Sequence, residues 1–554
     1  MGRQRCVVML GLLVACGGKD GTEPDSADGS PIVDSDTDTD TDTDTDTDAD
    51  TDTDTDSDTD TDTDTDSDTD TDSDTDTDTD SDTDTDTDTD TDSDTDTDTD
   101  TADTGTPLLT GCAVDRWDPA DFAAVYDVGP GQPLSHPNDV PWESIGPSTL
   151  VRIWADTTPY QAKWVLDVPG TETDPVVVLG VCDPVTGALP VIEGTGATTR
   201  TALDFWSESR GIIKIGGASS PGGSTDASWI YVEDLALRSA RGSFTDDGGS
   251  PATYADNAAA IFVEQGANVT LRGNELSDCG NGLFVAAASR DVSVIGNDIR
   301  DNGNVGSIYE HNSYTEALGI LFEHNLYGPL CAGCDGNNLK DRSAGTVIRY
   351  NRIEGGNRQL DLVDSGHVEL YDDPSYRDTF VYGNVLIEPD GAGNSQIVHY
   401  GGDSGDTTRY RAGTLWFAHN TVLSERPGNT TLVRLSAADH TLHLENSIVA
   451  SDGPLAVLES TGTAVVEDTW LPKGWRDSHS GSFTGSVGAS SVIVGVDPGF
   501  VDRPSRDVHL AAGSPAVDAA GPLDAAVTVD QEFANRQPVV RADDGLPDLG
   551  AHER

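Results

Sequence analysis

One short unit recurs along the middle of the chain and restricts the fold more than any other feature. Each copy has two or three apolar or alternating residues, then an asparagine, then another apolar residue. The seven copies are LRGNEL (Asn274), VIGNDI (Asn297), FEHNLY (Asn325), IRYNRI (Asn351), VYGNVL (Asn384), FAHNTV (Asn420) and LENSIV (Asn446). The asparagines are 23, 28, 26, 33, 36 and 26 residues apart. A period in this range is typical of proteins built from stacked structural repeats.

The residues between the asparagines predict short strands and no long helix. Each unit holds two or three short alternating runs that are broken by Gly, Asp and Asn. This pattern predicts an all-β solenoid of parallel strands, whose inward Val, Ile and Leu pack against the coils above and below. We expect each asparagine to adopt the left-handed turn conformation and its amide to stack on the asparagine of the next coil. A β-sandwich is the alternative, although nothing in a sandwich requires a strand–Asn–strand unit at a near-constant period.

The first 15 residues have the features of an export signal. Arg3 and Arg5 precede an apolar run at 7–14 that is too short to span a bilayer. The run ends in Leu-Val-Ala-Cys, which resembles the bacterial lipobox and implies cleavage before Cys16 and lipid attachment to its thiol. An ordinary secretory signal with a chance cysteine is the alternative. We expect a protein of the cell envelope, tethered by lipid to the outer membrane and exposed at the surface without a spanning helix.

A short linker, residues 16–34, leads into a block of alternating Asp and Thr or Ser at 35–104. Aspartate occupies every even position from 36 to 100, which gives 33 carboxylates. Such a block repels itself and has no apolar surface to bury, so it does not recover the entropy lost on ordering. We expect an extended tether with an upper reach of roughly 200 Å. A calcium-binding or glycosylated stalk is the alternative.

The charge of the remaining chain restricts its partners. Residues 105–554 carry 61 acidic and 28 basic side chains. Nucleic acid is excluded as a partner by the absence of a basic footprint. A polyanionic sugar is repelled at long range unless a local basic patch or bound cations intervene. We expect a monomer.

Five cysteines remain after Cys6 leaves with the signal and Cys16 takes the lipid. Cys331 and Cys334 form a C-x-x-C pair, and no second such pair or neighbouring histidine pair supports a zinc site. In an exported protein a short-loop disulfide is the preferred interpretation. With an odd number of thiols, one must stay unpaired within the chain.

Further stretches between residues 120 and 450 carry a family resemblance. They are YDVGPGQP (126–133), VPWESI (140–145), RGIIKIGGA (210–218), YADNAAAIFVE (254–264), GNGLFV (280–285), NGNVGSIYEHNSY (302–314), GNNLKDRSAG (336–345), EGGNRQLDLVD (354–364) and EPDGAGNSQIVHYGGDSG (388–405). With the seven asparagine units, they resemble the right-handed parallel β-helix family of the pectate-lyase-like superfamily, in a bacterial subgroup described as polysaccharide-degrading. The resemblance implies a β-helix over 105–496. The tail, 497–554, is similar to the terminal segment of secreted β-helix proteins, and we expect it to close the last coil and cap the open end.

Aligning the coils through their asparagines gathers polar residues in the middle of the solenoid. We assign them as catalytic (Lys340, Arg342, His311), substrate-binding (Asn312, Tyr314, Asn338, Arg358, His399, Tyr400) and metal-binding (Glu310, Asp361, Asp364) candidates. Lys340 and Arg342 stand out because the chain has only five lysines. No Ser–His–Asp order is evident in the sequence.

Polysaccharide lysis by β-elimination requires a base for the C5 proton and a cation that neutralises the uronate carboxylate. The resemblance implies a Lys or Arg base and Ca²⁺ held by Asp and Glu. Lys340 can be the base if desolvation and Arg342 lower its pKa, while Arg342 or Arg358 can bind the carboxylate. Glu310, Asp361 and Asp364 can supply oxygen ligands to Ca²⁺. The sequence departs from β-helix alginate lyases, which place a catalytic arginine in the coil after the lysine, because here that strand reads RQLDLVD and Arg358 is offset.

Three alternatives remain open. Asp361 with Asp364, or Glu310 with either, can serve a glycoside hydrolase that needs two carboxylates. A non-catalytic glycan-binding or adhesion protein suits the acidic surface and the tether equally well. Lys340 and Arg342 can also be a salt-bridged outer row, and His311 and His399 can be structural.

Overall fold

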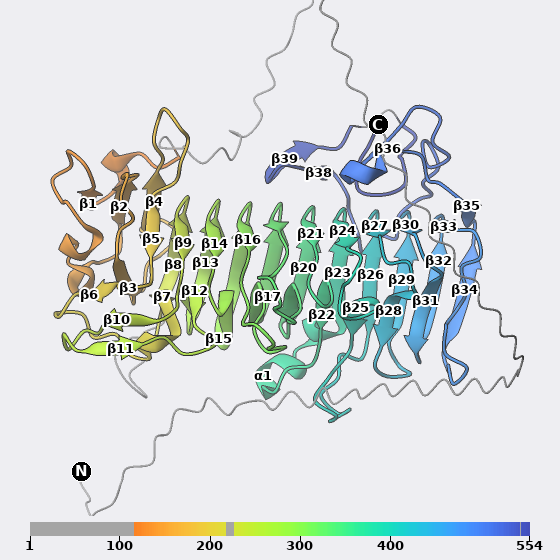
Figure 1. Ribbon diagram of the computed structural model, residues 1–554, viewed down its shortest axis with the longest axis horizontal. Helices are drawn as coiled ribbons and strands as arrows, with labels where there is room; N and C mark the ends of the chain where they lie inside the picture. The colour runs from red at the N-terminus through yellow and green to blue at the C-terminus, as the bar shows by residue number, and fades with distance from the viewer. Residues whose placement is uncertain (1–115, 218–226, 543–544) are drawn as a thin grey trace, which may run out of the picture. The chain divides into compact units, whose positions relative to one another are not determined.

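The computed structural model describes residues 116–217, 227–542 and 545–554. The predicted signal (1–15), the lipidated Cys16, the linker (16–34) and the tether (35–104) lie outside the described residues. Within them, successive coils stack in parallel along one axis, with the chain passing from the first coils at one end to the last at the other (Figure 1). The predicted all-β solenoid is therefore confirmed.

Most coils contribute one strand to each of three parallel ladders. The first ladder contains β3 (Ala162–Leu166), β7 (Gly211–Ile215), β12 (Ala259–Val263), the first halves of β15 (Asn281–Ile295) and β17 (Ser313–Glu323), β19 (Leu339–Asp341), β22 (Leu360–Leu362), β25 (Gln396–Tyr400), β28 (Thr430–Leu435) and β31 (Leu455–Ser460). The second contains β1 (Ala124–Val128), β2 (Thr149–Trp154), β4 (Val176–Val181), β8 (Ala227–Glu233), β13 (Gly266–Arg272), the second halves of β15 and β17, β20 (Ala344–Arg349), β23 (Asp378–Tyr382), β26 (Thr414–Ala418), β29 (Thr441–Glu445), β32 (Thr463–Glu467) and β34 (Ser486–Ser490).

The third ladder is a separate sheet of short strands. It contains β5 (Val191–Glu193), β9 (Ala236–Arg238), β14 (Glu275–Ser277), β16 (Asp298–Arg300), β18 (Leu326–Tyr327), β21 (Arg352–Glu354), β24 (Val385–Glu388), β27 (Thr421–Ser424), β30 (Ile448–Ser451), β33 (Trp470–Pro472) and β35 (Ile493–Gly495). The remaining strands are β6 (Thr198–Thr199), β10 (Ser243–Thr245), β11 (Pro251–Thr253) and the hairpins β36 (Phe500–Asp502) with β37 (Asp507–Leu510) and β38 (Gln531–Ala534) with β39 (Gln537–Val540).

Helical structure in the described residues is confined to short connections. One α-helix, α1 (Val368–Tyr371), follows β22, and six single 3-10 turns are η1 (Pro119–Asp121), η2 (Pro137–Asp139), η3 (Trp142–Ser144), η4 (Glu208–Arg210), η5 (Pro374–Arg377) and η6 (Arg503–Ser505). None of these helices is long and apolar enough to cross a membrane.

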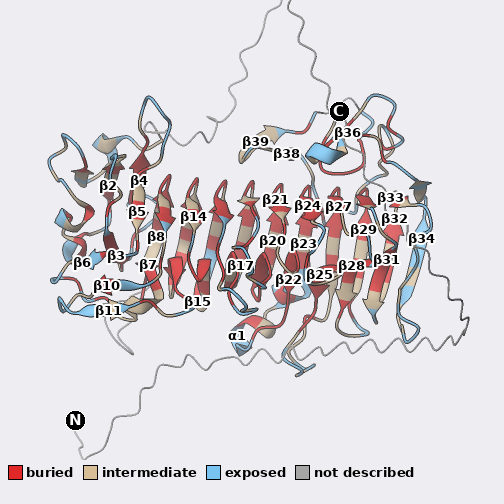
Figure 2. Cartoon of the chain, in the orientation of Figure 1, coloured by how far each residue is buried: buried red, intermediate tan, exposed pale blue. Residues whose placement is uncertain are grey.

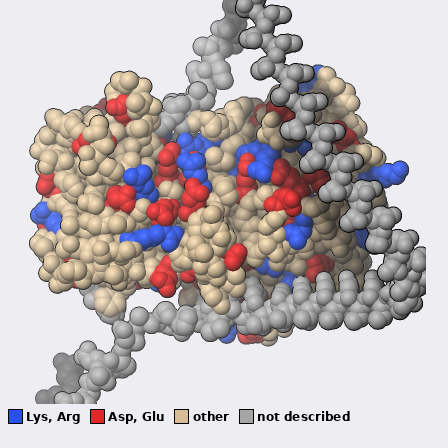
Figure 3. Space-filling view, viewed as in Figure 1, with Lys and Arg blue, Asp and Glu red and all other residues tan. Residues whose placement is uncertain are grey.

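Alternation along the strands builds one continuous core. Side chains two apart share a face of a strand, so residues such as Leu339, Leu360 and Val398 point inward and stack from coil to coil. Figure 2 shows the buried residues running through successive strands along the solenoid. On the face drawn in Figure 3, basic side chains lie beside acidic ones rather than forming a patch of one sign.

A buried ladder of asparagine amides links six coils. Each Nδ2 donates to the Oδ1 of the next asparagine, at 2.9 to 3.1 Å. The series comprises Asn274, Asn297, Asn325, Asn351, Asn384 and Asn420. The predicted amide stacking is confirmed for these six.

Two details of the asparagine prediction are wrong. The positive φ belongs to the residue before each ladder asparagine, as in His324 (φ 55°) and Tyr350 (φ 56°), and not to the asparagine itself. The seventh repeat is also shifted by one residue. Asn446 takes the positive φ (48°), and the backbone N–H of Asn420 donates to the Ser447 hydroxyl at 3.1 Å. The left-handed residue turns the chain, which leaves the next side chain pointing into the stack.

The C-terminal segment packs along the side of the solenoid. Phe500, Leu510 and Leu549 share an apolar cluster with Val385 and Ile448, which belong to β24 and β30 of the third ladder. Tyr350 also donates its hydroxyl hydrogen to Asp530 at 2.8 Å. The segment therefore packs along the flank of the later coils, and it reaches the last two strands of the ladder through Trp470 and Ile493 in the same cluster.

We predict that the Asn351→Ala substitution lowers the free energy of unfolding by about 3 kcal/mol, because it leaves buried backbone and amide groups of two neighbouring coils without partners. Asn351 donates to Phe322 O, Arg349 O and Asn384 Oδ1 and accepts from Asn325. Urea unfolding followed by circular dichroism measures the change. The exposed Asn429→Ala is the matched control, and an equal midpoint for both variants would contradict the role given to the ladder.

Candidate functional site

Some of the predicted site residues fall on the outward face of the first ladder. Register aligns six side chains in one column, one per coil, in the order Phe284, Tyr314, Lys340, Asp361, His399 and Arg434. Adjacent strands are about 4.8 Å apart, so neighbours in the column are within reach of each other. Alignment through the asparagines therefore correctly brought Tyr314, Lys340, Asp361 and His399 together.

Lys340 and Arg342 point outward but are covered. Each is only 1% exposed, because the loop at 401–411 lies over them and places Asp403 between them. Lys340 Nζ lies 2.8 Å from Asp403 Oδ2 and 2.9 Å from Asp361 Oδ2. Arg342 binds the two oxygens of Asp403 through Nη1 and Nη2 at 2.8 and 2.9 Å. Of the two earlier interpretations, the salt-bridged row describes this geometry better than an open catalytic row.

The ion pairs determine the protonation of the carboxylates. Lys340 and Arg342 hold the pKa of Asp403 far below its ordinary value, although burial alone would raise it. The charge of Lys340 and the hydrogen bond from His399 likewise hold the pKa of Asp361 well below its ordinary value. Both aspartates are therefore ionised at neutral pH. With Asp364 Oδ1 at 3.8 Å from Arg342 Nη1, three carboxyl groups surround the two cations of the cluster.

The predicted calcium ligands do not form a calcium site. Asp361 Oδ1 faces His399 Nδ1 at 2.9 Å, and its Oδ2 accepts from Asn337 Nδ2 at 2.9 Å as well as from Lys340. Asp364 Oδ1 accepts from the backbone N–H of Asp403 at 2.8 Å, and its Oδ2 accepts from the Ser404 hydroxyl. Oxygens already bound to donors are poor ligands for a hard cation. Among the described residues, no three His, Cys, Asp or Glu side chains, those of Glu310 included, are grouped to hold a metal ion.

His311 has a structural position. It is fully buried, its ring stacks on Tyr314 with centroids 5.6 Å apart, and its Nδ1 accepts from the backbone N–H of Asn337 at 2.9 Å. Burial and the nearby Lys340 charge lower the pKa of His311 to about 3, so it is neutral. This position does not fit the catalytic role predicted for His311, because the imidazole has no exposed surface; it fits the structural alternative.

Four of the predicted substrate-binding residues are buried in structural contacts. Asn312 and Asn338 form a second internal amide ladder with Asn302, at 3.0 and 2.9 Å. Arg358 binds Gln396 Oε1 at 2.9 Å, and Tyr400 is fully buried in the main core. The prediction that these four residues bind substrate is wrong, because their side chains are turned away from solvent. The strand registers and loops that turn them are not specified by the sequence pattern.

Tyr314 remains half-buried and reachable. Its ring stacks on Phe284 with centroids 5.1 Å apart, and its hydroxyl accepts from Arg342 Nε at 2.9 Å. Glu316, two residues further along the same strand, was missed by the sequence analysis although YTEA shows the same alternation. Burial raises the pKa of Glu316, which lies beside the half-exposed His367.

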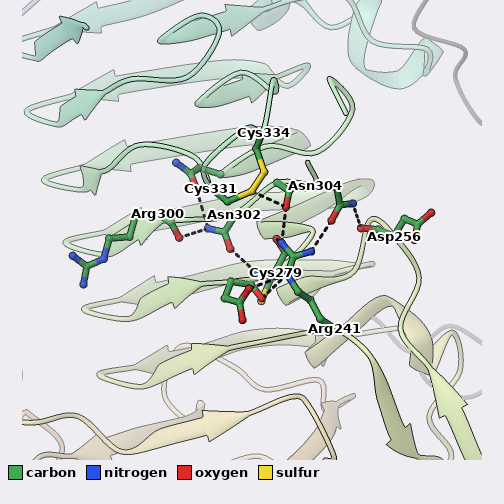
Figure 4. The surroundings of a disulfide bond; sticks show 11 residues. Arg241, Asp256, Cys279, Arg300, Asn302, Asn304, Cys331 and Cys334 are labelled. Carbon is green, nitrogen blue, oxygen red and sulfur yellow. Dashed lines mark hydrogen bonds and ion pairs between the residues drawn. A yellow bond between two sulfur atoms is a disulfide. The ribbon is translucent and has the colours of Figure 1, made fainter. Parts of the chain in front are cut away.

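The predicted Cys331–Cys334 disulfide is confirmed (Figure 4). It lies next to the 302–312 loop, where the backbone N–H of Cys331 donates to Asn302 O at 3.0 Å. Among the described residues the free thiol is the buried Cys279, whose pKa burial raises to about 12. Arg241 donates to Cys279 O and Asn304 Oδ1 in the same cluster. The disulfide thus fixes the loop that carries Glu310 and His311.

An open groove lies on a different face from the Lys340 cluster, on the outward side of the second ladder. We call it the flank groove. It has a volume of about 540 Å³ and crosses β8, β13, β15, β17, β20 and β23. Its lining includes Trp229 and Tyr231 at one end, Thr270 and Ser293 in the middle and Arg349 and Tyr382 at the other end. The sequence gives no signal for this groove, because its lining consists of ordinary strand residues such as Ser293, Leu321 and Val347.

We predict that the Asp403→Ala substitution lowers the free energy of unfolding by about 3–5 kcal/mol, because it leaves two buried cations short of a carboxylate. Asp406→Ala, in the same loop, is the control, since Asp406 pairs with Arg409 at the surface and such pairs contribute less than about 1 kcal/mol. Chemical unfolding at pH 7 measures both. Equal losses would show that Asp403 does not hold the cluster.

The same ion pairs predict how stability depends on pH. The folded pKa values of Asp361 and Asp403 are depressed, so their contribution is complete above the unfolded value of about 3.9 and is lost as pH falls below it. For each carboxylate, we expect the free energy of unfolding to fall by about 1 kcal/mol between pH 7 and pH 3. The Asp403→Asn variant should show a smaller loss over this interval than the unmodified protein.

Comparison with known proteins agrees with the observed coils. Residues 250–402 match the family described as "Right handed beta helix region". No curated protein matches the chain.

The chain is also similar to several solved structures. An alginate lyase from Paenibacillus sp. str. FPU-7 is 9% identical, with 67% of this chain and 99% of that chain covered, at a TM-score of 0.33. The pectate lyase Pel9A is 12% identical, with 81% and 98% covered, at a TM-score of 0.39. The GH136 lacto-N-biosidase from Eubacterium ramulus is 12% identical, with 68% of each chain covered, at a TM-score of 0.34. Likenesses of this size carry no argument about activity. The stacked parallel ladders and the matched region together identify the chain as a right-handed parallel β-helix protein.

Proposed function

We propose that the protein acts on an extended polysaccharide, which it binds along the flank groove. The observation that carries the proposal is that six neighbouring coils line the groove, which is closed at its far end where Tyr382 packs against Val527 of the C-terminal segment. Five steps of about 4.8 Å give a span of about 24 Å. A long, shallow channel of this kind suits a linear polymer better than an enclosed small molecule.

The groove lining suits sugars. Trp229 and Tyr231 supply partly exposed aromatic faces at one end, whereas Tyr382 at the other end is buried. Aromatic rings of this kind offer an apolar body with a polar edge, which complements the apolar face and hydroxyl rim of a pyranose. Thr270 and Ser293 keep the floor low and present hydroxyl groups between these rings.

The charges in and beside the groove favour a neutral polymer. Arg349 pairs with Glu323, and Arg272 pairs with Glu233 at 3.2 Å. A carboxylate therefore neutralises the charge of each guanidinium group. These pairs leave no net positive charge that would attract an anionic polymer to this acidic chain.

We also propose, from the sequence alone, that the β-helix is displayed at the cell surface on a lipid attached to Cys16. The short apolar run before Cys16 and the aspartate-rich block after it support this placement. A surface location gives the flank groove access to polymers outside the cell.

We predict that the Trp229→Ala substitution in the full-length chain weakens binding to a neutral polysaccharide about tenfold, or ~1.4 kcal/mol, because a stacking face is lost. Affinity electrophoresis against a panel of neutral and acidic polysaccharides measures the change. Tyr309→Ala is the control, since Tyr309 is exposed and outside the groove. Unchanged binding in the Trp229 variant, or binding of acidic polymers only, would contradict the proposal.

Cleavage of an acidic polysaccharide by β-elimination is a second candidate function. It is favoured by the half-buried Tyr314, whose hydroxyl accepts a hydrogen bond from Arg342 Nε at 2.9 Å. The hydrogen bond from Arg342 leaves the phenol oxygen as an acceptor, and a phenolate at this position can remove the C5 proton of a uronate. Lys340 is a weaker choice for the base because two carboxylates hold its ammonium group at 2.8 and 2.9 Å.

For this second function we predict that the unmodified protein releases unsaturated products from an acidic polysaccharide and that a chelator does not stop it, because the aspartates do not form a calcium site. The Tyr314→Phe variant should lose at least about 100-fold in rate, whereas Tyr309→Phe should not change it. Ultraviolet absorbance and reducing ends are followed together. Reducing ends without absorbance would indicate hydrolysis. If neither signal appeared, the protein would bind a polysaccharide without cleaving it.

A further inference from the structure

Three side chains from three successive coils form a chain of hydrogen bonds that the mechanisms above do not use. Asp361 Oδ1 lies 2.9 Å from His399 Nδ1, and His399 Nε2 lies 2.8 Å from Ser436 Oγ. The residues are 38 and 37 positions apart in sequence. They follow the order Asp, His, Ser over 75 residues, so the sequence alone gives no sign that they meet.

The protonation of the imidazole follows from its neighbours. Asp361 is ionised, since Lys340 and His399 hold its pKa far below the ordinary value, and an ionised carboxylate only accepts hydrogen bonds. The proton of His399 therefore lies on Nδ1, which donates to Asp361. Burial lowers the pKa of His399, so the ring is neutral and Nε2 has a free lone pair. That lone pair accepts the hydroxyl hydrogen of Ser436.

The ladder fixes this arrangement. His399 lies beside Asp361 in the pairing of β22 with β25, and it lies beside Arg434 in the pairing of β25 with β28. Ser436 directly follows β28 and is held by its backbone N–H, which donates to Tyr400 O at 3.1 Å. His399 is buried, whereas Ser436 is half-exposed. The base is thus shielded from water while the hydroxyl group is within reach of a substrate.

We infer that Ser436 is a nucleophile, activated by His399 and oriented by Asp361, that accepts the acyl group of a carboxylic ester such as an O-acylated sugar. This activity goes beyond polysaccharide binding and β-elimination. A hydroxyl group is a weak nucleophile unless an adjacent base takes its proton, and this is the arrangement that supplies one.

The reaction balances with water as the second substrate. Ser436 Oγ bonds to the ester carbonyl carbon as its proton passes to His399 Nε2. The carbon–oxygen bond to the alcohol then breaks, and His399 returns the proton to the leaving oxygen. Water attacks the carbonyl carbon of the acyl-serine as His399 Nε2 takes one of its protons. The bond between that carbon and Ser436 Oγ then breaks, and His399 returns the proton to Oγ, which releases the carboxylic acid. Asp361 stabilises the imidazolium formed in each step.

Arg434 provides positive charge on the same side of the strand. Arg434 and Ser436 are two residues apart at the end of β28, so both side chains point outward. Arg434 also contributes to the lowered pKa of His399, which places the guanidinium near the imidazole. A cation at this position favours the oxyanion that develops on the ester carbonyl.

The test uses the full-length protein with p-nitrophenyl acetate and, separately, a fluorophosphonate probe. We expect measurable ester hydrolysis and a single adduct that peptide mass spectrometry assigns to Ser436. The Ser436→Ala substitution should reduce hydrolysis at least 100-fold and abolish the adduct. Ser482→Ala is the matched control. Ser482 is exposed, and its hydroxyl group is hydrogen-bonded to the hydroxyl group of Ser480 at 2.9 Å rather than to a histidine.

Two results would overturn the inference. One is an unmodified protein that neither hydrolyses the ester nor reacts with the probe. The other is a Ser436→Ala variant that keeps full activity. Labelling of the unmodified protein does not depend on the folding of any variant, so it decides the matter even if Ser436→Ala does not fold. Glycan binding in the flank groove is measured separately, and its outcome is independent of both results.

Discussion

Parallel pairing of each coil with the next, reinforced by buried amide hydrogen bonds, is the interaction on which the rest of this molecule depends. A ladder asparagine satisfies its own amide and also the backbone of its neighbours, as Asn351 does toward Asn325 and Asn384. Buried polar groups are tolerated only when they are paired. One unpaired member would therefore disturb two coils, which restricts the spacing and the orientation of every strand.

This regular stacking turns sequence positions far apart into columns of neighbours. Lys340, Asp361 and His399 occupy one outward column, each on its own coil. In water such charges would interact weakly, but the loop at 401–411 excludes solvent and makes their pairing strong. The same stacking on another face yields a groove instead, whose lining includes Thr270 and Ser293.

The column contains two kinds of chemistry side by side. At one end, Tyr314 is half-exposed and hydrogen-bonded to Arg342, while beyond Lys340 the chain of hydrogen bonds runs from Asp361 through His399 to Ser436. Asp361 belongs to both parts, since it accepts from Lys340 as well as from His399. A substitution of Asp361 therefore affects both the ion-pair cluster and the chain of hydrogen bonds to Ser436. A substitution of Ser436 affects only that chain of hydrogen bonds.

The sequence by itself determined the solenoid, its period, the asparagine ladder and the coils that carry the polar residues. It could do so because these features repeat locally, and a repeated local pattern has only one way to stack. Only the tertiary structure decided which of those residues meet solvent. Asp403 reaches Lys340 from 63 residues away and Ser436 reaches His399 from 37 residues away, through loops whose paths no periodic pattern specifies. The burial of His311, Asn338 and Tyr400, the flank position of the C-terminal segment and the open groove all follow from such non-repeating contacts.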